Sequence, residues 1–352
     1  MPYKMLIEEA RIFDKTELIF YLYECLSQKK KIELSFLPEG PSAEACGLYN
    51  LLDKFCTETG YSKSDITIIT GNMLEHHDQY KIIKSTSGWY EIKIIQEWVQ
   101  NNKWEITYQP RYHFGSFVGL SRWPRLWLAA WLFHHHHEKT LQTFHSSFAC
   151  NYRTSKNDGV YDDLGLDLLN QYDCDNLSEV IGFLNQCPIV LKDDLEQTKN
   201  IKISEGYPAT EQTSLYPLQV PANLNIVYQY NNIFADIIVE PNVIGDCFLS
   251  TEKIWRCIIA RRPFIVMANN NHLHNMQKLG FKTFNKWFNE DYDYYIAQDR
   301  IKHIQSTVNI ISNWTTQELA EKLQDMYTVL DYNFQHFMNI SRKDFQQHFG
   351  AQ

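Results

Sequence analysis

The sequence of 352 residues has no long hydrophobic run, no regularly spaced cysteines and no excess of basic residues. Its longest apolar run, residues 126–133, is far shorter than the ~20 residues needed to cross a bilayer. The N-terminus carries Lys4, Glu8 and Glu9 and lacks the apolar core of a signal peptide. We therefore expect no stable membrane span and a cytoplasmic location.

The cysteines and the charge balance exclude further classes. Eight cysteines are scattered without a Cys-x-x-Cys pair or zinc spacing, which predicts reduced thiols in a reducing compartment. The net charge is −9, with 33 lysines and arginines against 42 acidic residues. This balance argues against a protein that wraps nucleic-acid backbone, although it leaves room for a local basic cleft. Gly-x-Gly-x-x-Gly, Walker and nucleophile-elbow motifs are also absent.

What is present is material for a large α/β core. Apolar residues make up 44% of the chain and aromatic residues 14%. Helix patterns alternate with β-branched strand patterns, which predicts parallel sheets. The expected helices are 16–28, 44–58, 122–137, 177–186, 250–262 and 271–279, and the pattern is helical from 315 to 348. The expected strands are 31–37, 65–70, 90–95, 114–119, 140–143, 224–228, 235–240 and 264–267. The polar stretch 101–110 is the predicted linker, and 150–222 the predicted irregular insertion.

Residues 248–268 carry the clearest chemical signal. Glu252 and Lys253 lie in the first turn of an expected helix that Ser250 or Thr251 can cap. Free backbone N–H groups, the helix dipole and the lysine charge would together hold a phosphate. A carboxylate beside them can accept hydrogen bonds from sugar hydroxyls, so the pair suits a sugar nucleotide. The alternative is an ordinary capped helix with a solvated Glu and Lys.

The segments 235–242 and 248–268 resemble the donor-binding half of the α1,3-fucosyltransferase family, whose signature runs F-E-N … Y-I-T-E-K-L-W … A … P-V-V. The matching positions, with Pro241 inserted in the first pair, are Glu240, Asn242, Thr251, Glu252, Lys253 and Trp255. Exostosin-like transferases carry a similar S-E-K step. The chain is also similar, through 279–293 and 114–126, to a broad set of bacterial and phage glycosyltransferase-like proteins.

This resemblance implies a GT-B-like α/β fold, with two Rossmann-like domains facing across a cleft. Residues 1–110 would bind the acceptor, residues 111–314 the nucleotide sugar, and 315–352 would add C-terminal helices. The donor-binding residues implied are Arg122, Arg125, Glu240, Asn242, Thr251, Glu252 and Lys253. Lys253 and one of the two arginines would hold the diphosphate, and Glu252 would contact the ribose. The resemblance further implies an inverting reaction without a cofactor or catalytic metal.

An inverting transfer needs a group that deprotonates the acceptor hydroxyl. Glu39 directly follows an expected strand, where a doubly wound sheet opens its cleft, and is the predicted base. The alternative is a turn residue between two prolines. His113, Asn72 and Glu44 are further candidates.

Three other groups suggest chemistry but favour structural interpretations. Acidic residues in 290–293 suggest a metal cluster, yet a structural turn or an interdomain contact is the preferred reading. The run 134–137 is four histidines on an expected helix, where only residues three or four apart share a face. Trp123, Trp127 and Trp131 form a stripe that predicts core packing.

The sequence therefore predicts a glycosyltransferase that uses a nucleoside-diphosphate sugar. The acceptor would be a glycan, a modified DNA base or a protein. The alternative is a non-catalytic binding or scaffold protein that keeps the same fold.

Overall fold

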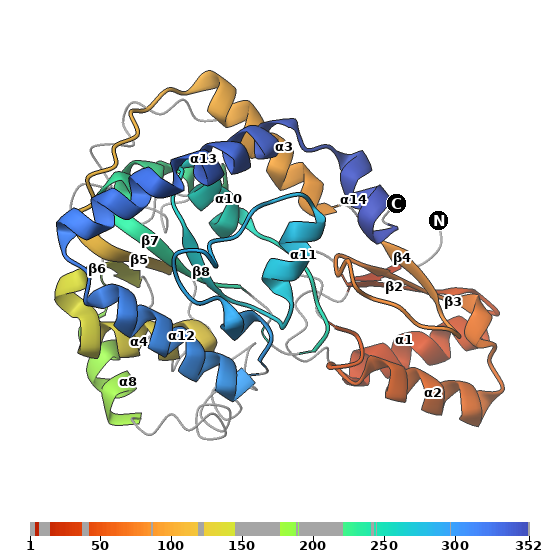
Figure 1. Ribbon diagram of the computed structural model, residues 1–352. Helices are drawn as coiled ribbons and strands as arrows, with labels where there is room; N and C mark the ends of the chain where they lie inside the picture. The colour runs from red at the N-terminus through yellow and green to blue at the C-terminus, as the bar shows by residue number, and fades with distance from the viewer. Residues whose placement is uncertain are drawn as a thin grey trace, which may run out of the picture.

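Two four-stranded sheets, in which all strands pair in parallel, organise the chain (Figure 1). The computed structural model describes residues 4–6, 15–36, 42–85, 87–118, 123–144, 177–187, 189, 221–240, 243, 245–295 and 297–350. Helices connect the strands, so the expected α/β class with parallel sheets is confirmed. Within the described residues, none of the helices combines the length and hydrophobicity that crossing a bilayer requires.

The first sheet follows the chain in simple order, β1-β2-β3-β4. Its elements are β1 (Lys4–Leu6), α1 (Lys15–Ser27), β2 (Ile32–Phe36), α2 (Leu48–Thr59), η1 (Lys63–Asp65), β3 (Ile66–Thr70) and β4 (Lys81–Lys84). Leu34 and Ile68 are paired across β2 and β3, and both side chains are fully buried. Helix α2 starts after Gly47 and ends at Gly60, both with positive φ. A left-handed glycine after the last turn is a common helix terminator.

The second sheet has the order β6-β5-β7-β8, so the chain reverses direction across it after β6. Its elements are β5 (Tyr112–Val118), α4 (Trp123–His136), η2 (His137–Lys139), β6 (Thr140–Phe144), α8 (Leu177–Leu184), η5 (Pro221–Asn232), β7 (Ile233–Val239), α10 (Glu252–Ile259), β8 (Phe264–Met267) and α11 (His272–Lys278). Every residue of β7 is buried. This is typical of a central strand in a parallel sheet that is covered on both faces.

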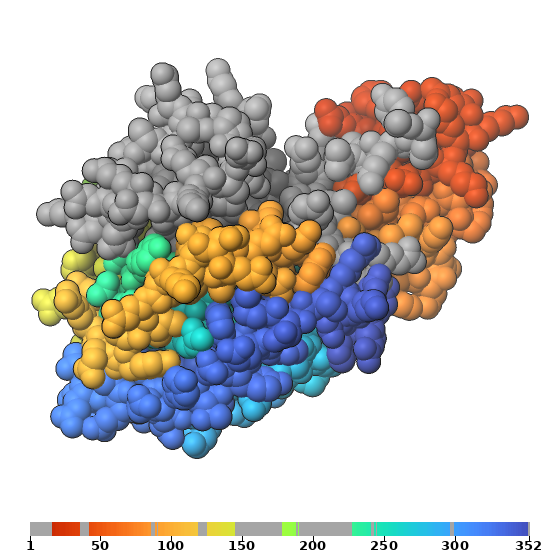
Figure 2. All heavy atoms as spheres, turned by 90° about the horizontal axis from the view of Figure 1, so that it is seen from above, coloured from red at the N-terminus to blue at the C-terminus, as the bar shows by residue number. Residues whose placement is uncertain are grey.

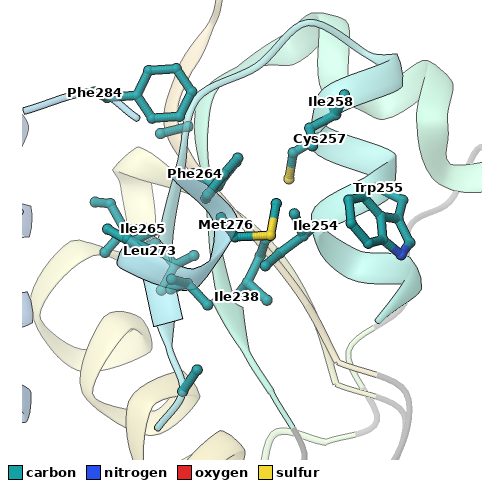
Figure 3. Packing of buried hydrophobic residues seen from close by; sticks show 14 of the residues in the cluster. Ile238, Ile254, Trp255, Cys257, Ile258, Phe264, Ile265, Leu273, Met276 and Phe284 are labelled. Atoms are coloured by element: carbon teal, nitrogen blue, oxygen red, sulfur yellow. The ribbon is translucent and has the colours of Figure 1, made fainter. Parts of the chain in front are cut away.

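Helix α10 is buried along its whole length after the first turn, and it contacts α13 (Thr316–Asn339), η5, α3 (Ser87–Asn101) and β7. Figure 3 shows Ile254 and Cys257 facing Phe264 and Met276. Trp255 lies on another side of the helix, and its ring centroid is 5.4 Å from that of Phe337. The apolar residues of α10 therefore hold the helix in the core of the second sheet, and its first turn lies at the end of that sheet.

Two expected strands are wrong. Residues 90–95 lie in helix α3 (Ser87–Asn101), because Ile92, Ile95 and Trp98 form a buried face at helical spacing. Residues 224–228 lie in the 3-10 helix η5. Helix α3 shares the hydrophobic core of the second sheet and contacts α10. Figures 1 and 2 show it beside α13. The domain boundary expected near residue 110 stays a prediction.

The C-terminal segment is helical, as expected. It follows η6 (Asp291–Asp293) and consists of α12 (Ala297–Ser312), α13 (Thr316–Asn339) and α14 (Arg342–Phe349). Helix α13 begins with a capping box formed by Thr315 and Glu318. Helix α14 returns to the first sheet, where Nζ of Lys84 donates to the carbonyl oxygen of Phe349 at 3.0 Å. The C-terminus therefore links the two sheets.

Candidate functional site

A narrow hollow lies at the carboxyl ends of β5 and β7. The chain starts the second sheet with β5, adds β6 on one side and then β7 on the other, so the strand order reverses between β5 and β7. In open α/β sheets, ligands bind outside the carboxyl ends of the strands at such a switch point. The residues that line the hollow are Phe117, Val118, Arg125, Asp236, Ile237, Ile238, Val239, Lys253 and Arg256.

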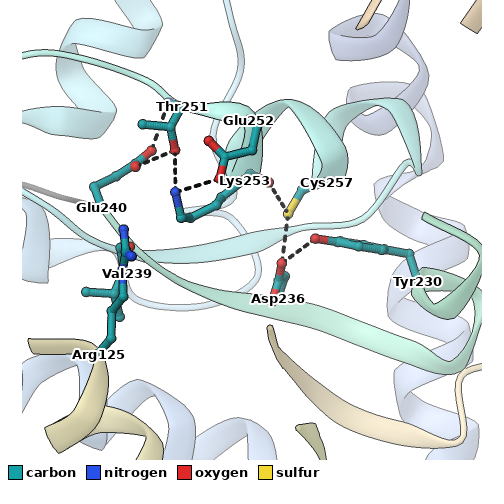
Figure 4. A network of polar contacts seen from close by, with 9 residues as sticks. All are labelled: Arg125, Tyr230, Asp236, Val239, Glu240, Thr251, Glu252, Lys253 and Cys257. Carbon is teal, nitrogen blue, oxygen red and sulfur yellow. Dashed lines mark hydrogen bonds and ion pairs between the residues drawn. The ribbon is translucent and has the colours of Figure 1, made fainter. Parts of the chain in front are cut away.

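The first turn of α10 supplies a network of polar groups at this place (Figure 4). Nζ of Lys253 donates to Oε1 of Glu252 at 2.8 Å and to Oγ1 of Thr251 at 3.0 Å. Thr251 in turn donates from Oγ1 and from its backbone N–H to the buried carboxylate of Glu240, at 2.6 and 3.1 Å. Glu240 directly follows β7, so this network ties the helix to the strand.

Thr251 occupies the N-cap position of α10, but its side chain makes no capping hydrogen bond. Of the two residues expected to cap the helix, Ser250 or Thr251, the structure places Thr251 at the N-cap, and its hydroxyl instead donates to Glu240 and accepts from Nζ of Lys253. As a consequence, no side chain of the N-cap residue covers the backbone N–H groups of the first turn. The N-terminal end of the helix dipole faces the switch point.

Two arginines join Lys253 around the hollow. Arg125, on α4, is buried, and its Nε donates to the carbonyl oxygen of Val239 at 3.2 Å. Arg256 lies one turn after Lys253 on α10 and is also buried. The three cationic side chains come from two helices that are far apart in the sequence. The fold thus concentrates positive charge beside the end of β7.

Burial and the nearby positive charges shift the pKa values of the acidic residues in opposite directions. Burial alone would raise the pKa of Glu252, but the charges of Lys253 and then Arg256 outweigh it and hold that pKa below its usual range. Burial raises the pKa of Glu240, and the charge of Lys253 only partly opposes this. Burial raises the pKa of Asp236 as well. The cations therefore outweigh burial at Glu252, whereas burial outweighs the cations at Glu240 and Asp236.

Asp236 forms the inner side of the hollow. Its Oδ2 accepts a hydrogen bond from the hydroxyl of Tyr230 at 2.6 Å, and Sγ of Cys257 lies 3.6 Å away. Both groups are buried, and burial raises the pKa of Tyr230 and of Cys257 well above the usual values. This network contains no charge besides that of Asp236 itself, and it fixes the carboxylate on the strand.

The structure brings together five of the predicted donor residues: Arg125, Glu240, Thr251, Glu252 and Lys253. Arg122, Asn242 and the predicted base Glu39 lie outside the described residues. Sequence reasoning missed Arg256 and Glu91. Arg256 lies four residues after Glu252, so helical spacing was a usable signal. Glu91 was not considered, because residues 90–95 were expected to form a strand and lie in helix α3 instead. Burial, followed by the charge of Glu252, raises the pKa of Glu91.

The three other candidate bases lie elsewhere. Nε2 of His113 is 2.7 Å from the carbonyl oxygen of Trp314, and burial lowers the pKa of this histidine. Glu44 is exposed, and Asn72 is buried at the contact between the two sheets. None of the three lines the hollow at the switch point.

The acidic residues of 290–293 have structural roles. Asp293 accepts hydrogen bonds from the backbone N–H groups of Leu273 and His274 at 2.9 and 3.1 Å and so caps α11. Glu290 accepts from the backbone N–H of Phe284 at 2.8 Å. Among the described residues there is no cluster of three or more His, Cys, Asp or Glu arranged to hold a metal ion.

The histidine run and the tryptophan stripe also have packing roles. His134 contacts the carbonyl oxygen of Glu179 through Nε2 at 2.8 Å, and His136 contacts Oδ1 of Asn309 at 2.9 Å. Trp127 is buried in the core of the second sheet and Trp131 packs against that core, while the side chain of Trp123 lies outside those described.

Comparison of the chain with protein-family models, with curated proteins and with solved structures finds no match. The resemblance to the fucosyltransferases therefore stays a prediction, and the geometry of the hollow carries the functional argument.

Proposed function

We propose that this protein is a glycosyltransferase that binds a nucleoside-diphosphate sugar at the carboxyl ends of β5 and β7. The observation that carries the proposal is the meeting of Arg125, Lys253 and Arg256 with the start of α10 at the switch point of the second sheet. Arginine, lysine and helix N-termini are the groups that hold phosphate oxygens. Glu240 and Glu252 add acceptors for sugar hydroxyls within the same network.

The proposed architecture is GT-B-like. The second sheet would bind the donor, and the first sheet would present the acceptor. Two all-parallel sheets joined through the contact of α14 with β4 support this assignment. The resemblance to inverting fucosyltransferases favours a single displacement without a catalytic metal.

In the proposed reaction the acceptor oxygen attacks the anomeric carbon and forms a new C–O bond. The bond from that carbon to the diphosphate oxygen breaks, and its electron pair leaves with the nucleoside diphosphate. Negative charge grows on the leaving group, so the three cations would stabilise the transition state more than the ground state. Loss of one such donor typically costs ~10²–10³ in rate.

The acceptor proton would pass to a carboxylate. Glu39 remains the predicted base, and Glu91 is a second candidate because it is half-buried near Glu252 on the helix that covers α10. A carboxyl whose pKa is raised accepts a proton more readily near neutral pH. Glu39→Gln and Glu91→Gln, compared in the same transfer assay, would distinguish the two.

The experiment is a thermal-shift panel of UDP, GDP, CMP and dTDP, followed by donor hydrolysis with the nucleotide that binds. A ligand at a hundredfold excess over its Kd stabilises by about 2.7 kcal/mol, which is roughly 4 °C in a chain of this size. We expect one diphosphate to produce such a shift. Lys253→Met and Arg256→Met should abolish it, because they remove the charge and keep an apolar stem.

Removal of Lys253 also takes the ion-pair partner from the partly buried Glu252, which destabilises the protein by itself. The ligand-induced shift is therefore compared within each variant, and Glu252→Gln combined with Lys253→Met relieves the unpaired charge. Lys93→Met, on the exposed surface of α3, is the matched control and should keep the full shift. If no nucleotide binds at millimolar concentration, or if Lys253→Met binds normally, the proposal is wrong. Binding without any turnover of donor sugars would favour the non-catalytic alternative.

A further inference from the structure

The side chain of Asn72 is completely buried where the first sheet meets the loop that leads into α10. Its Nδ2 donates to the carbonyl oxygen of Asp246 at 2.8 Å and to Oε2 of Glu75 at 3.1 Å. Its Oδ1 accepts from the backbone N–H groups of Phe248 and Leu74, both at 3.0 Å. An asparagine amide has two donor and two acceptor positions, so all four are used here.

The same loop makes further close contacts with the first sheet. The backbone N–H of Met73 donates to the carbonyl oxygen of Phe248 at 3.1 Å. Gly245 has a φ of 77°, and a Cβ there would lie 2.7 Å from Cβ of Ala45 and 2.9 Å from Cβ of Ser42. Only glycine accommodates both the positive φ and this approach of the backbone. Residues 245–248 therefore lie directly on the turn that precedes α2.

Glu75, which accepts a hydrogen bond from Asn72, is itself held by the first sheet and its helix. Its Oε1 accepts from the hydroxyl of Tyr49 on α2 at 2.6 Å, and its Oε2 accepts from the backbone N–H of Ala43 at 3.0 Å. The carboxylate is buried. Asn72 thus connects a well-anchored group of the first sheet with two backbone groups of the loop.

We propose that Asn72 is a positioning residue for the ligand site, because it fixes residues 246–248 and thereby the start of α10. Only Leu249 and Ser250 separate this loop from Thr251, the N-cap of the helix. Asn72 does not line the hollow, so it acts through the loop and not on the ligand. This inference rests on the proposed function, since the site that it positions is the proposed diphosphate site.

The energetic reason is the burial of the groups that Asn72 satisfies. A buried donor or acceptor that loses its partner costs far more than an average hydrogen bond contributes. Asn72→Asp replaces Nδ2 with an oxygen that faces the carbonyl oxygen of Asp246 and the carboxylate of Glu75, so two attractions become repulsions. We expect the loop to separate from the first sheet while the core around α10 stays folded.

The thiol of Cys247 reports this opening without any ligand. Cys247 lies within the clamped loop and is 2% exposed, whereas Cys257 is 0% exposed in α10 and serves as the reference for global unfolding. Alkylation by N-ethylmaleimide, mapped by peptide mass spectrometry, measures both. In Asn72→Asp we expect Cys247 to react about tenfold faster or more, with Cys257 unchanged.

Asn102→Asp is the matched control, since among the described residues Nδ2 of Asn102 donates to the carbonyl oxygen of Trp98, four residues earlier in the chain. It should leave both labelling rates as they are in the natural sequence. Asn72→Ala, which introduces no charge, is the second variant if Asn72→Asp does not fold. It should expose Cys247 in the same selective way.

A binding measurement then tests the positioning role. Because coupling between two equilibria is reciprocal, the variant that opens the loop should bind the nucleotide found in the panel of UDP, GDP, CMP and dTDP more weakly, and that nucleotide should slow labelling of Cys247. Unchanged labelling of Cys247, or faster labelling with unchanged nucleotide affinity, would overturn the inference. If the unaltered protein binds none of the four nucleotides, the proposed function fails, while the ratio of the Cys247 and Cys257 labelling rates still shows whether Asn72 holds the loop.

Discussion

His272 should make the stability of the protein depend on pH in a defined direction. It is the first residue of α11, its side chain is 1% exposed, and its Nε2 has no hydrogen-bond partner among the described residues. Its ring centroid lies 5.3 Å from that of Phe248, in the loop that leads into α10. Burial, and then the charge of Arg300, lowers the pKa of His272 to about 3. The folded protein therefore holds this imidazole neutral.

The direction and the size of this change in stability follow from proton linkage. The unfolded chain protonates this histidine near its usual pKa of about 6.5, whereas the folded chain does not until the pH is far lower. The unfolded state binds more protons between these values, so stability is lost as the pH falls below 6.5. At pH 5 the difference is about 1.5 pH units, which corresponds to roughly 2 kcal/mol at 1.36 kcal/mol per unit.

The measurement is urea unfolding at pH 7.5 and pH 5.0, followed by tryptophan fluorescence, to which the buried Trp255 contributes. His272→Leu should lose about 2 kcal/mol less than the unaltered protein between the two pH values. Any constant cost of the substitution cancels in this comparison. His348→Leu, at an exposed position, should keep nearly the full pH dependence. An equal loss in His272→Leu and in the unaltered protein would refute the buried, neutral state of this side chain.

Two further substitutions test the frame around the site by the same urea assay. Arg262 is completely buried, and its guanidinium donates to the carbonyl oxygens of Tyr230, Ile233 and Thr107. Arg262→Met should therefore lower the free energy of unfolding by at least about 3 kcal/mol. A loss below about 1 kcal/mol would show that these carbonyl groups find other partners. At Gly115 a Cβ would lie 2.5 Å from Cδ1 of Ile233, so Gly115→Ala should destabilise by about 1–3 kcal/mol. A neutral result would show that the end of the Ile233 side chain moves aside without cost.

Local patterns predicted those elements whose apolar spacing admits one interpretation. Ile254, Trp255 and Ile258 recur at helical spacing and Pro263 follows, so α10 and β8 were both expected where they occur. The α3 segment was ambiguous, because its apolar residues alternate at first and then follow the helical repeat. The segment is helical in the structure, where it packs against the distant elements α10 and η5. A period read from a short window does not contain that information.

The candidate site was predictable only in part for a similar reason. Glu252 and Lys253 are neighbours in the sequence, and their chemistry is visible there. Arg125 comes from another helix, and the sequence offered it together with Arg122 as alternatives. Arg256 was missed although it lies at helical spacing from Glu252. The distance from Arg125 to the side chains of α10 depends on the order of strands in the sheet, which no local pattern specifies.

The sequence by itself determined the fold class of the protein. It specifies alternating helices and parallel strands, a large apolar core, an acidic surface and an acid-base pair at the start of a helix, because these follow from composition and short-range periodicity. The tertiary structure decided that the chain reverses between β5 and β7, that α3 covers α10 and that Arg125 meets Lys253 and Arg256. Those arrangements arise from contacts between segments more than a hundred residues apart, where the burial of whole faces selects one pairing among many.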